Sequence, residues 1–280
     1  MRKTLRRLLP ALLGLALVAG TLTSCDWPDG TRYAKPVFTQ VEQTTGILYR
    51  TTTTWNGQPI PLSLDLYRPV GDTATNRPAV VWLFGGSWRF GTRDQLKAFA
   101  QDSARRGYVG VTIDYRTRPD QEPFDVVGAA FDAYDDTIAA VQFLKDHAAD
   151  YGINPDQIIT AGHSAGGVNA LHTAYLPGTR GPATSPVAAA VGISALSFAN
   201  PTTGDPPTAQ VHGTADETVP FASGNDICNR SIAAGNFCVM FAYEGADHLL
   251  PHDPRYQADI MTKIADFIYE QVILPDQRGG

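Results

Sequence analysis

The residue types of a nucleophilic acyl-transfer site occur in this chain in a suggestive order: a serine, then an aspartate, then a histidine. Ser164 is the middle residue of Gly162-His163-Ser164-Ala165-Gly166. A serine hydroxyl is a weak nucleophile at neutral pH, so it needs a base to accept its proton and a carboxylate to orient that base. Asp216 and His248 follow Ser164 in the chain and supply both groups.

The flanks of Ser164 favour a nucleophile elbow, a sharp turn between a strand and a helix. The apolar run 158–161 precedes the turn, and Val168 and Leu171 follow at helical spacing. Gly162 and Gly166 have no Cβ, which leaves room for the tight turn. A lone Gly-x-Ser-x-Gly also occurs in ordinary Gly/Ser loops, and it is the strand before and the helix after that favour the elbow.

The acid candidate lies in the segment 211–220, Val-His-Gly-Thr-Ala-Asp-Glu-Thr-Val-Pro. This segment forms a loop directly after a predicted strand. We predict that Asp216 is the acid. Glu217 is the local alternative, and an aspartate after Gly-Thr-Ala could also be a simple turn residue.

The base candidate is His248, in another loop that follows a predicted strand. His252 lies four residues further on and is the alternative, because predicted boundaries shift by a few residues. His163 occupies the variable position of the elbow, where its side chain points away from the hydroxyl. The other histidines are interpreted as surface or structural residues: His147, His172 and His212.

An acyl-transfer site also needs backbone N–H groups that stabilise an oxyanion. Ala165 is the first candidate, because it follows the nucleophile at a helix start where N–H groups lack partners. Gly86 and Ser87 are the others, in a small-residue loop after the apolar run 79–84. The alternative for that loop is a plain glycine-rich turn.

The elements around these residues alternate between strands and helices. Two strands at 47–54 and 60–66, joined at Asn56-Gly57, form a predicted hairpin. Further strands are predicted at 79–84, 109–113, 158–161, 187–193, 208–211 and 237–243, and helices at 93–106, 130–149, after Ser164, 221–234 and 254–272. This order predicts one α/β domain with a mostly parallel sheet and helices on both faces.

Together these segments resemble the α/β-hydrolase superfamily, and within it carboxylesterases related to hormone-sensitive lipase and bacterial feruloyl esterases. The motifs that carry the resemblance are, in order, 84–91, Asp114-Tyr115-Arg116, 151–156, 162–167 and the loops of Asp216 and His248. The resemblance runs from about residue 46 to 272. It implies a single α/β-hydrolase domain without a large cap, because the insertions at 116–128 and 176–186 are short.

The resemblance implies a serine ester hydrolase that works through an acyl-enzyme, on a small-molecule or polymer-borne ester with a short acyl chain. Alternatives are a feruloyl or acetyl esterase on polysaccharides, a lipase and an arylformamidase. The family usually has histidine where this chain has Phe84, which predicts an altered polar network beside the oxyanion hole. A different class remains open: a surface-anchored binding module on an inactive hydrolase scaffold.

The first residues predict export. A basic start is followed by the apolar run 8–18, which is too short to span a bilayer comfortably, and then by Leu22-Thr23-Ser24-Cys25. This pattern resembles a bacterial lipobox, so we predict a signal peptide over 1–24, lipidation at Cys25 and membrane anchoring. The alternative is an ordinary secretory signal. We expect a tether over 25–45 and the hydrolase domain over 46–275.

Composition indicates a globular domain, with 43% hydrophobic and 18% charged residues among 280. The net charge of −6 becomes −10 when the four basic residues of 1–24 are removed, which argues against nucleic-acid binding. Cys228 and Cys238 are candidates for a disulfide in an oxidising compartment, or else two buried thiols. No metal or cofactor is predicted, and the oligomeric state stays open.

Overall fold

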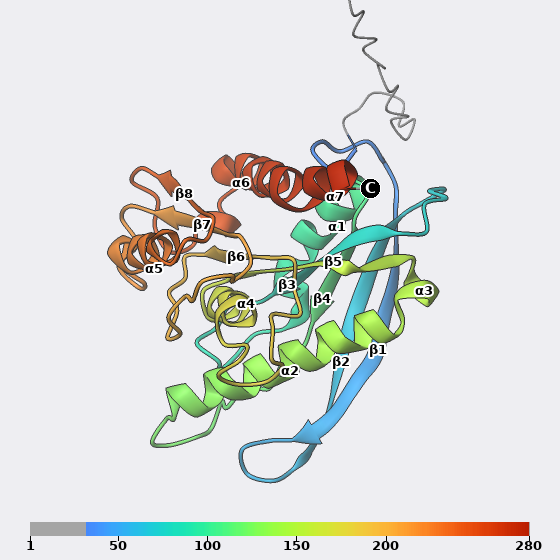
Figure 1. Cartoon of the computed structure of the whole chain (residues 1–280). Coiled ribbons are helices and arrows are strands. Elements are labelled where there is room, and N and C mark those ends of the chain that lie inside the picture. Colours follow the sequence, from blue (N-terminus) through green and yellow to red (C-terminus); the bar gives the residue numbers. More distant parts are fainter. Residues whose placement is uncertain (1–31, 280) are drawn as a thin grey trace, which may run out of the picture. The chain divides into compact units, whose positions relative to one another are not determined.

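A computed structural model describes residues 32–279 of the chain. Its centre is an eight-stranded sheet in the order β1-β2-β4-β3-β5-β6-β7-β8, seen with its helices in Figure 1. β1 pairs antiparallel with β2, and β2 pairs antiparallel with β4. All further pairs along the sheet are parallel, so the carboxyl ends of six neighbouring strands lie at one edge.

The strands differ in length between the hairpin and the parallel part of the sheet. The hairpin strands β1 and β2 are the long ones, together with β5, which leads to Ser164. The bounds are β1 Val41–Thr53, β2 Pro59–Pro69, β3 Arg77–Leu83, β4 Val109–Ile113, β5 Ile153–His163, β6 Ala189–Ile193, β7 Thr208–Gly213 and β8 Cys238–Tyr243.

Helices cover both faces of the sheet, and two separate apolar clusters result. Leu83 and Val81 of β3 belong to the cluster under α2, α4 and α5, whereas Val80 and Trp82 belong to the cluster under α1 and α6. The helices are η1 Arg93–Leu96, α1 Lys97–Arg105, α2 Val126–Asp146, α3 Ala148–Tyr151, α4 Ala165–Tyr175, α5 Phe221–Ala233, η2 Leu250–His252, α6 Pro254–Ile268, η3 Tyr269–Ile273 and α7 Leu274–Gly279. Every residue of β3 is buried, and residues 78–83 are all apolar, as expected of a strand that helices cover on both faces.

The predicted element order and the mostly parallel sheet are confirmed, and some boundaries move. α2 begins at Val126 instead of 130, because the side chain of Asp125 accepts a hydrogen bond from Gly128 N and caps the helix. β1 begins at Val41, inside the segment expected to be a tether. Upstream of it, the buried side chain of Tyr33 packs against Tyr108. The predicted signal peptide and Cys25 lie outside the described residues.

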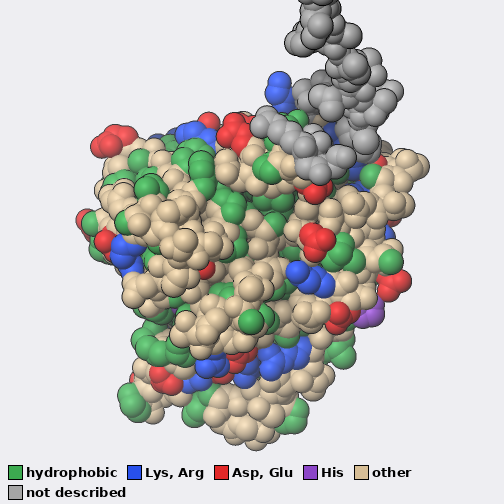
Figure 2. Space-filling model, viewed as in Figure 1, with side chains coloured by type: hydrophobic (Ala, Val, Ile, Leu, Met, Phe, Trp, Pro, Cys, Tyr) green, Lys and Arg blue, Asp and Glu red, His purple; other side chains and the backbone are tan. Residues whose placement is uncertain are grey.

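Charged side chains of both signs are interspersed on the face of the molecule that Figure 2 shows. Ion pairs at the surface include that of Arg180 with Asp135. None of the helices between residues 32 and 279 combines the length and apolar character that a bilayer crossing requires.

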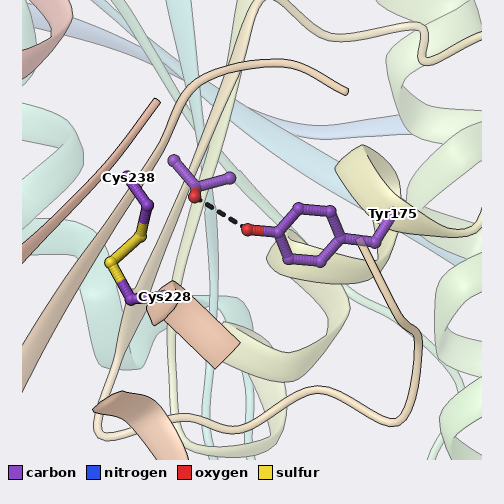
Figure 3. Close-up of a disulfide and its surroundings, with 4 residues drawn as sticks. Tyr175, Cys228 and Cys238 are labelled. Carbon is purple, nitrogen blue, oxygen red and sulfur yellow. Dashed lines mark hydrogen bonds between the residues drawn. A yellow bond between two sulfur atoms is a disulfide. The ribbon is translucent and has the colours of Figure 1, made fainter. Parts of the chain in front are cut away.

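Cys228 and Cys238 form a disulfide, with their Cα atoms 5.5 Å apart. Figure 3 shows this bond, which joins α5 to β8, with Tyr175 nearby. The Tyr175 hydroxyl hydrogen-bonds the Thr208 hydroxyl at the start of β7. Of the two alternatives for Cys228 and Cys238, a disulfide or two buried thiols, the structure contains the disulfide.

Candidate active site

Ser164 lies on a strained turn between β5 and α4, with φ of 55° and ψ of −123°. Its backbone N–H donates to Ile193 O at the end of β6. The two flanking glycines are required by close packing. A Cβ on Gly162 would lie 2.4 Å from the backbone of Gly166, and a Cβ on Gly166 would lie 2.1 Å from Leu83 O. The turn therefore has the geometry of a nucleophile elbow.

The structure brings Ser164, His248 and Asp216 into one hydrogen-bonded chain. Ser164 Oγ lies 2.9 Å from His248 Nε2, and His248 Nδ1 lies 2.9 Å from Asp216 Oδ2. The three residues come from loops that follow β5, β8 and β7 at the same edge of the sheet. Since a carboxylate only accepts, Nδ1 of His248 carries the hydrogen and Nε2 is free to accept from the serine hydroxyl.

Asp216 is buried and held by its own loop. Its Oδ1 accepts hydrogen bonds from Thr218 N at 2.9 Å and Val219 N at 2.8 Å. His212 is fully buried beside it, with Nε2 at 2.8 Å from Val219 O and 3.3 Å from Asp216 Oδ2. Burial lowers the pKa of His212, so the ring is neutral there. The alternative acid, Glu217, is exposed.

The other histidine candidates lie near the triad without contacting the serine hydroxyl. His252 is exposed, and its ring stands edge-on to His163 at 5.1 Å between centroids. His163 is buried, and its Nε2 lies 2.8 Å from the backbone O of His248. The position of His163 in the elbow predicts a side chain that points away from the nucleophile, and therefore not the base. Nothing in the local pattern indicated that the ring would contact the loop of His248.

The backbone groups expected to form an oxyanion hole are gathered around Ser164. Gly86 and Ser87 line the same pocket as Ser164, with φ of 132° and 53°. A Cβ on Gly85 would lie 3.1 Å from Ser164 Cβ, so this loop passes directly over the nucleophile. Ala165 is the first residue of α4, where the N–H groups of the first turn have no partner within the helix.

Phe84, at the start of the 84–91 loop, is anchored by an aromatic neighbour. Its ring stacks on Tyr115 at 4.0 Å between centroids and an interplanar angle of 8°. The Tyr115 hydroxyl donates to Phe84 O at 2.6 Å. The start of the 84–91 loop is thus held by a stack and one buried hydrogen bond.

A pocket of about 410 Å³ opens at Ser164 and His248. Such a volume lies within the range that small organic ligands occupy. Phe90 and Leu249 line it and are 65% and 57% exposed, so they form an apolar entrance. Among the described residues, no cluster of histidine, cysteine and carboxylate side chains is arranged to hold a metal ion.

One family model matches the part of the chain that holds the elbow. Residues 64–185 match a family model described as BD-FAE. This segment includes Ser164 and the 84–91 loop, but not Asp216 or His248. Two similar curated proteins are a probable isoprenylcysteine alpha-carbonyl methylesterase of Arabidopsis thaliana and carboxylesterase NlhH of Mycobacterium tuberculosis.

The curated relatives match over limited regions. The Arabidopsis protein is 33% identical over 103 residues, which cover 37% of this chain and 20% of that protein. The Mycobacterium protein is 34% identical over 93 residues, which cover 33% of this chain and 27% of that protein. The matched region thus spans 20% of one relative's length and 27% of the other's.

Solved structures match over most of the chain. Esterase 2 of Thermogutta terrifontis is 25% identical and covers 82% of this chain and 91% of its own, with a TM-score of 0.68. The chain has the α/β-hydrolase fold. The Thermogutta enzyme has also been observed with butyrate bound, at 26% identity, 83% and 94% coverage and a TM-score of 0.68.

Two features of this chain agree with the α/β-hydrolase pattern in detail. Hydrolases of this fold carry the nucleophile on a strand-to-helix elbow, followed along the chain by an acid and then a histidine. Ser164, Asp216 and His248 follow that order and meet at the carboxyl edge of the sheet. The connections 114–125, 176–188 and 194–207 are short, so residues 32–279 contain no large cap.

Proposed function

We propose that this chain is a serine hydrolase of carboxylic esters, with Ser164 as nucleophile, His248 as base and Asp216 as the acid that orients it. The single observation that carries the proposal is the pair of 2.9 Å contacts that link Ser164, His248 and Asp216. The likeness to esterases, at 25% identity over most of the chain, supports the same reaction class.

The reaction begins when His248 Nε2 takes the proton of the Ser164 hydroxyl and Ser164 Oγ attacks the ester carbonyl carbon. The tetrahedral intermediate collapses, the ester C–O bond breaks, and His248 gives its proton to the departing alcohol. Water then enters, loses a proton to His248 and attacks the acyl-enzyme. The carboxylic acid leaves and His248 returns the proton to Ser164 Oγ, which restores the free enzyme.

The oxyanion of both intermediates is stabilised by the N–H groups of Gly86, Ser87 and Ala165. Loss of one such donor typically costs about 3 kcal/mol of transition-state stabilisation. Gly86 suits this task because its φ of 132° is rarely adopted by other residues, and a Cβ there would lie 1.9 Å from Phe90 O.

The pocket favours esters with a short acyl chain. Its volume of about 410 Å³ and its open, apolar entrance at Phe90 and Leu249 suit a small apolar group. The butyrate complex and a propionate complex of the Thermogutta enzyme are consistent with this size class.

A panel of p-nitrophenyl esters from acetate to palmitate tests the proposal. We expect fastest turnover for acetate to butyrate and a steep decline for long chains, because a pocket of this size cannot enclose a long acyl chain. Ser164→Ala should reduce kcat by at least about 10⁴-fold, since the remaining groups cannot form the acyl-enzyme.

Two results would contradict the proposal. The first is hydrolysis by Ser164→Ala at the rate of the parent enzyme. The second is a folded parent protein that hydrolyses no ester of the panel, which would favour a binding module on an inactive hydrolase scaffold.

A further inference from the structure

The imidazole of His163 connects the nucleophile elbow to the loop of the base. His163 directly precedes Ser164, and its side chain is only 4% exposed. Its Nε2 lies 2.8 Å from the backbone O of His248, whose own ring lies 2.9 Å from Ser164 Oγ. The elbow and the base loop are therefore joined twice, once through the reacting side chains and once through His163.

The carbonyl of His248 has no donor in its own loop. A turn that starts at this carbonyl would take its hydrogen bond from the backbone nitrogen three residues later, and that residue is Pro251, which has no N–H. The next amide, His252 N, donates to Leu249 O instead. The hydrogen bond from His163 therefore satisfies the His248 carbonyl, which the local turn leaves without a donor.

The protonation state of His163 suits a permanent donor. A carbonyl only accepts, so Nε2 of His163 carries the hydrogen. Burial lowers the pKa of His163 to about 4, and the ring is neutral at the pH where an ester hydrolase with a histidine base works. The hydrogen bond to His248 O therefore forms with an uncharged His163 ring. The centroid of this ring lies 5.0 Å from that of the His248 ring.

The same imidazole also packs against the oxyanion loop. A Cβ on Gly85 would lie 3.0 Å from His163 Nδ1, so the loop backbone runs along the ring. His163 thus touches the loop beside the oxyanion donors and the loop of the base while its own backbone precedes the nucleophile.

We propose that His163 is a positioning residue that fixes the loop of His248 against the nucleophile elbow. The proposal rests on the proposed ester hydrolysis, because it assigns His163 to the geometry of that same site. His163 is among the residues that line the pocket, but its hydrogen bond goes to His248 O and not to the reacting atoms. Its loss should therefore slow the chemical step much more than it weakens substrate binding. A misplacement of reacting groups by about 1 Å can cost about 100-fold in rate.

The test compares His163→Gln with His163→Met, two side chains of similar length and volume of which only glutamine can donate to His248 O. With p-nitrophenyl acetate, we expect His163→Met to lose about 10- to 100-fold in kcat with KM within about twofold. His163→Gln should stay within about threefold of the parent, because its amide restores the donor. His172→Met is the matched control, since it also removes a buried histidine, and it should leave kcat unchanged.

The outcome separates this inference from the proposed function. The parent enzyme and Ser164→Ala decide first whether ester hydrolysis occurs at Ser164. If it does, a folded His163→Met with the parent's kcat, or a His163→Gln as slow as His163→Met, would overturn the positioning role. If His163→Met fails to fold, His163→Asn replaces it, because asparagine is too short to reach His248 O. The proposal then requires a low kcat for His163→Asn and fails if its kcat equals that of the parent.

Discussion

The six histidines of the chain are divided between one that contacts the nucleophile and several that the fold keeps uncharged. His248 is the one that faces both Ser164 and Asp216. His163 and His172 are buried, and burial lowers the pKa of each to about 4. The same residue type therefore contacts the serine hydroxyl in one place and is a buried packing and hydrogen-bonding group in others.

The buried histidines predict a loss of stability in acid. In the folded protein His163 and His172 titrate near 4, whereas in the unfolded chain they titrate near the ordinary 6.5. The unfolded state therefore holds more protons between these values, and the free energy of unfolding should fall as the pH falls through this window. Each histidine contributes a slope of up to about 1.4 kcal/mol per pH unit within this window. Above pH 6.5 both states hold the ring neutral, so the slope is zero and the stability is fully retained.

Urea unfolding at several pH values across this window measures the slope. His172→Phe should lower the slope by up to about 1.4 kcal/mol per pH unit, because it removes one titrating ring without touching the triad. A free energy of unfolding that is flat from pH 6.5 to 4 would show that these rings are not buried as described.

The helix α5 and the strand β8 form the unit that carries two of the three proposed catalytic residues on its flanks. Asp216 precedes α5, and His248 follows β8. β8 is the edge strand of the sheet, and most of its residues are only half-buried. The disulfide between Cys228 and Cys238 joins the two elements directly, ten residues apart in sequence. It therefore holds the edge of the sheet from which the base loop departs.

Removal of this disulfide should destabilise the protein by about 2–3 kcal/mol, the value expected when a short loop is released in the unfolded chain. The change is Cys228→Ser with Cys238→Ser, measured by urea unfolding and by the temperature at which ester hydrolysis is lost. A reducing agent should lower the stability of the parent and leave the double variant unaffected. Equal stability of parent and double variant under oxidising conditions would contradict the role of this bond.

Much of the molecule could be predicted from the order of its segments. Apolar runs such as 79–84 and 109–113 identified the buried strands, and their alternation with helical segments indicated the mostly parallel sheet. The elbow around Ser164 was recognisable because glycine is required at both flanks of so tight a turn. The loops of Asp216 and His248 could be proposed as partners because each follows a strand that ends at the same sheet edge.

What escaped prediction depends on contacts between distant segments. Residues 32–40 have no periodic pattern, yet Tyr33 packs on Tyr108 and Arg32 pairs with Asp72. The contact of His163 with the His248 carbonyl joins residues 85 positions apart. The stack of Phe84 on Tyr115 likewise joins distant residues, and neither residue alone indicates its partner.

The proposed activity depends on the reactivity of the Ser164 hydroxyl, and a fluorophosphonate probe reports on it directly. The folded protein is treated with the probe at neutral pH, and the modified peptide is identified by mass spectrometry, with Ser164→Ala as control. We expect one equivalent of adduct, located at Ser164, and none on Ser164→Ala. A folded protein that takes up no probe, or takes it up at a different serine, would show that Ser164 is not the nucleophile.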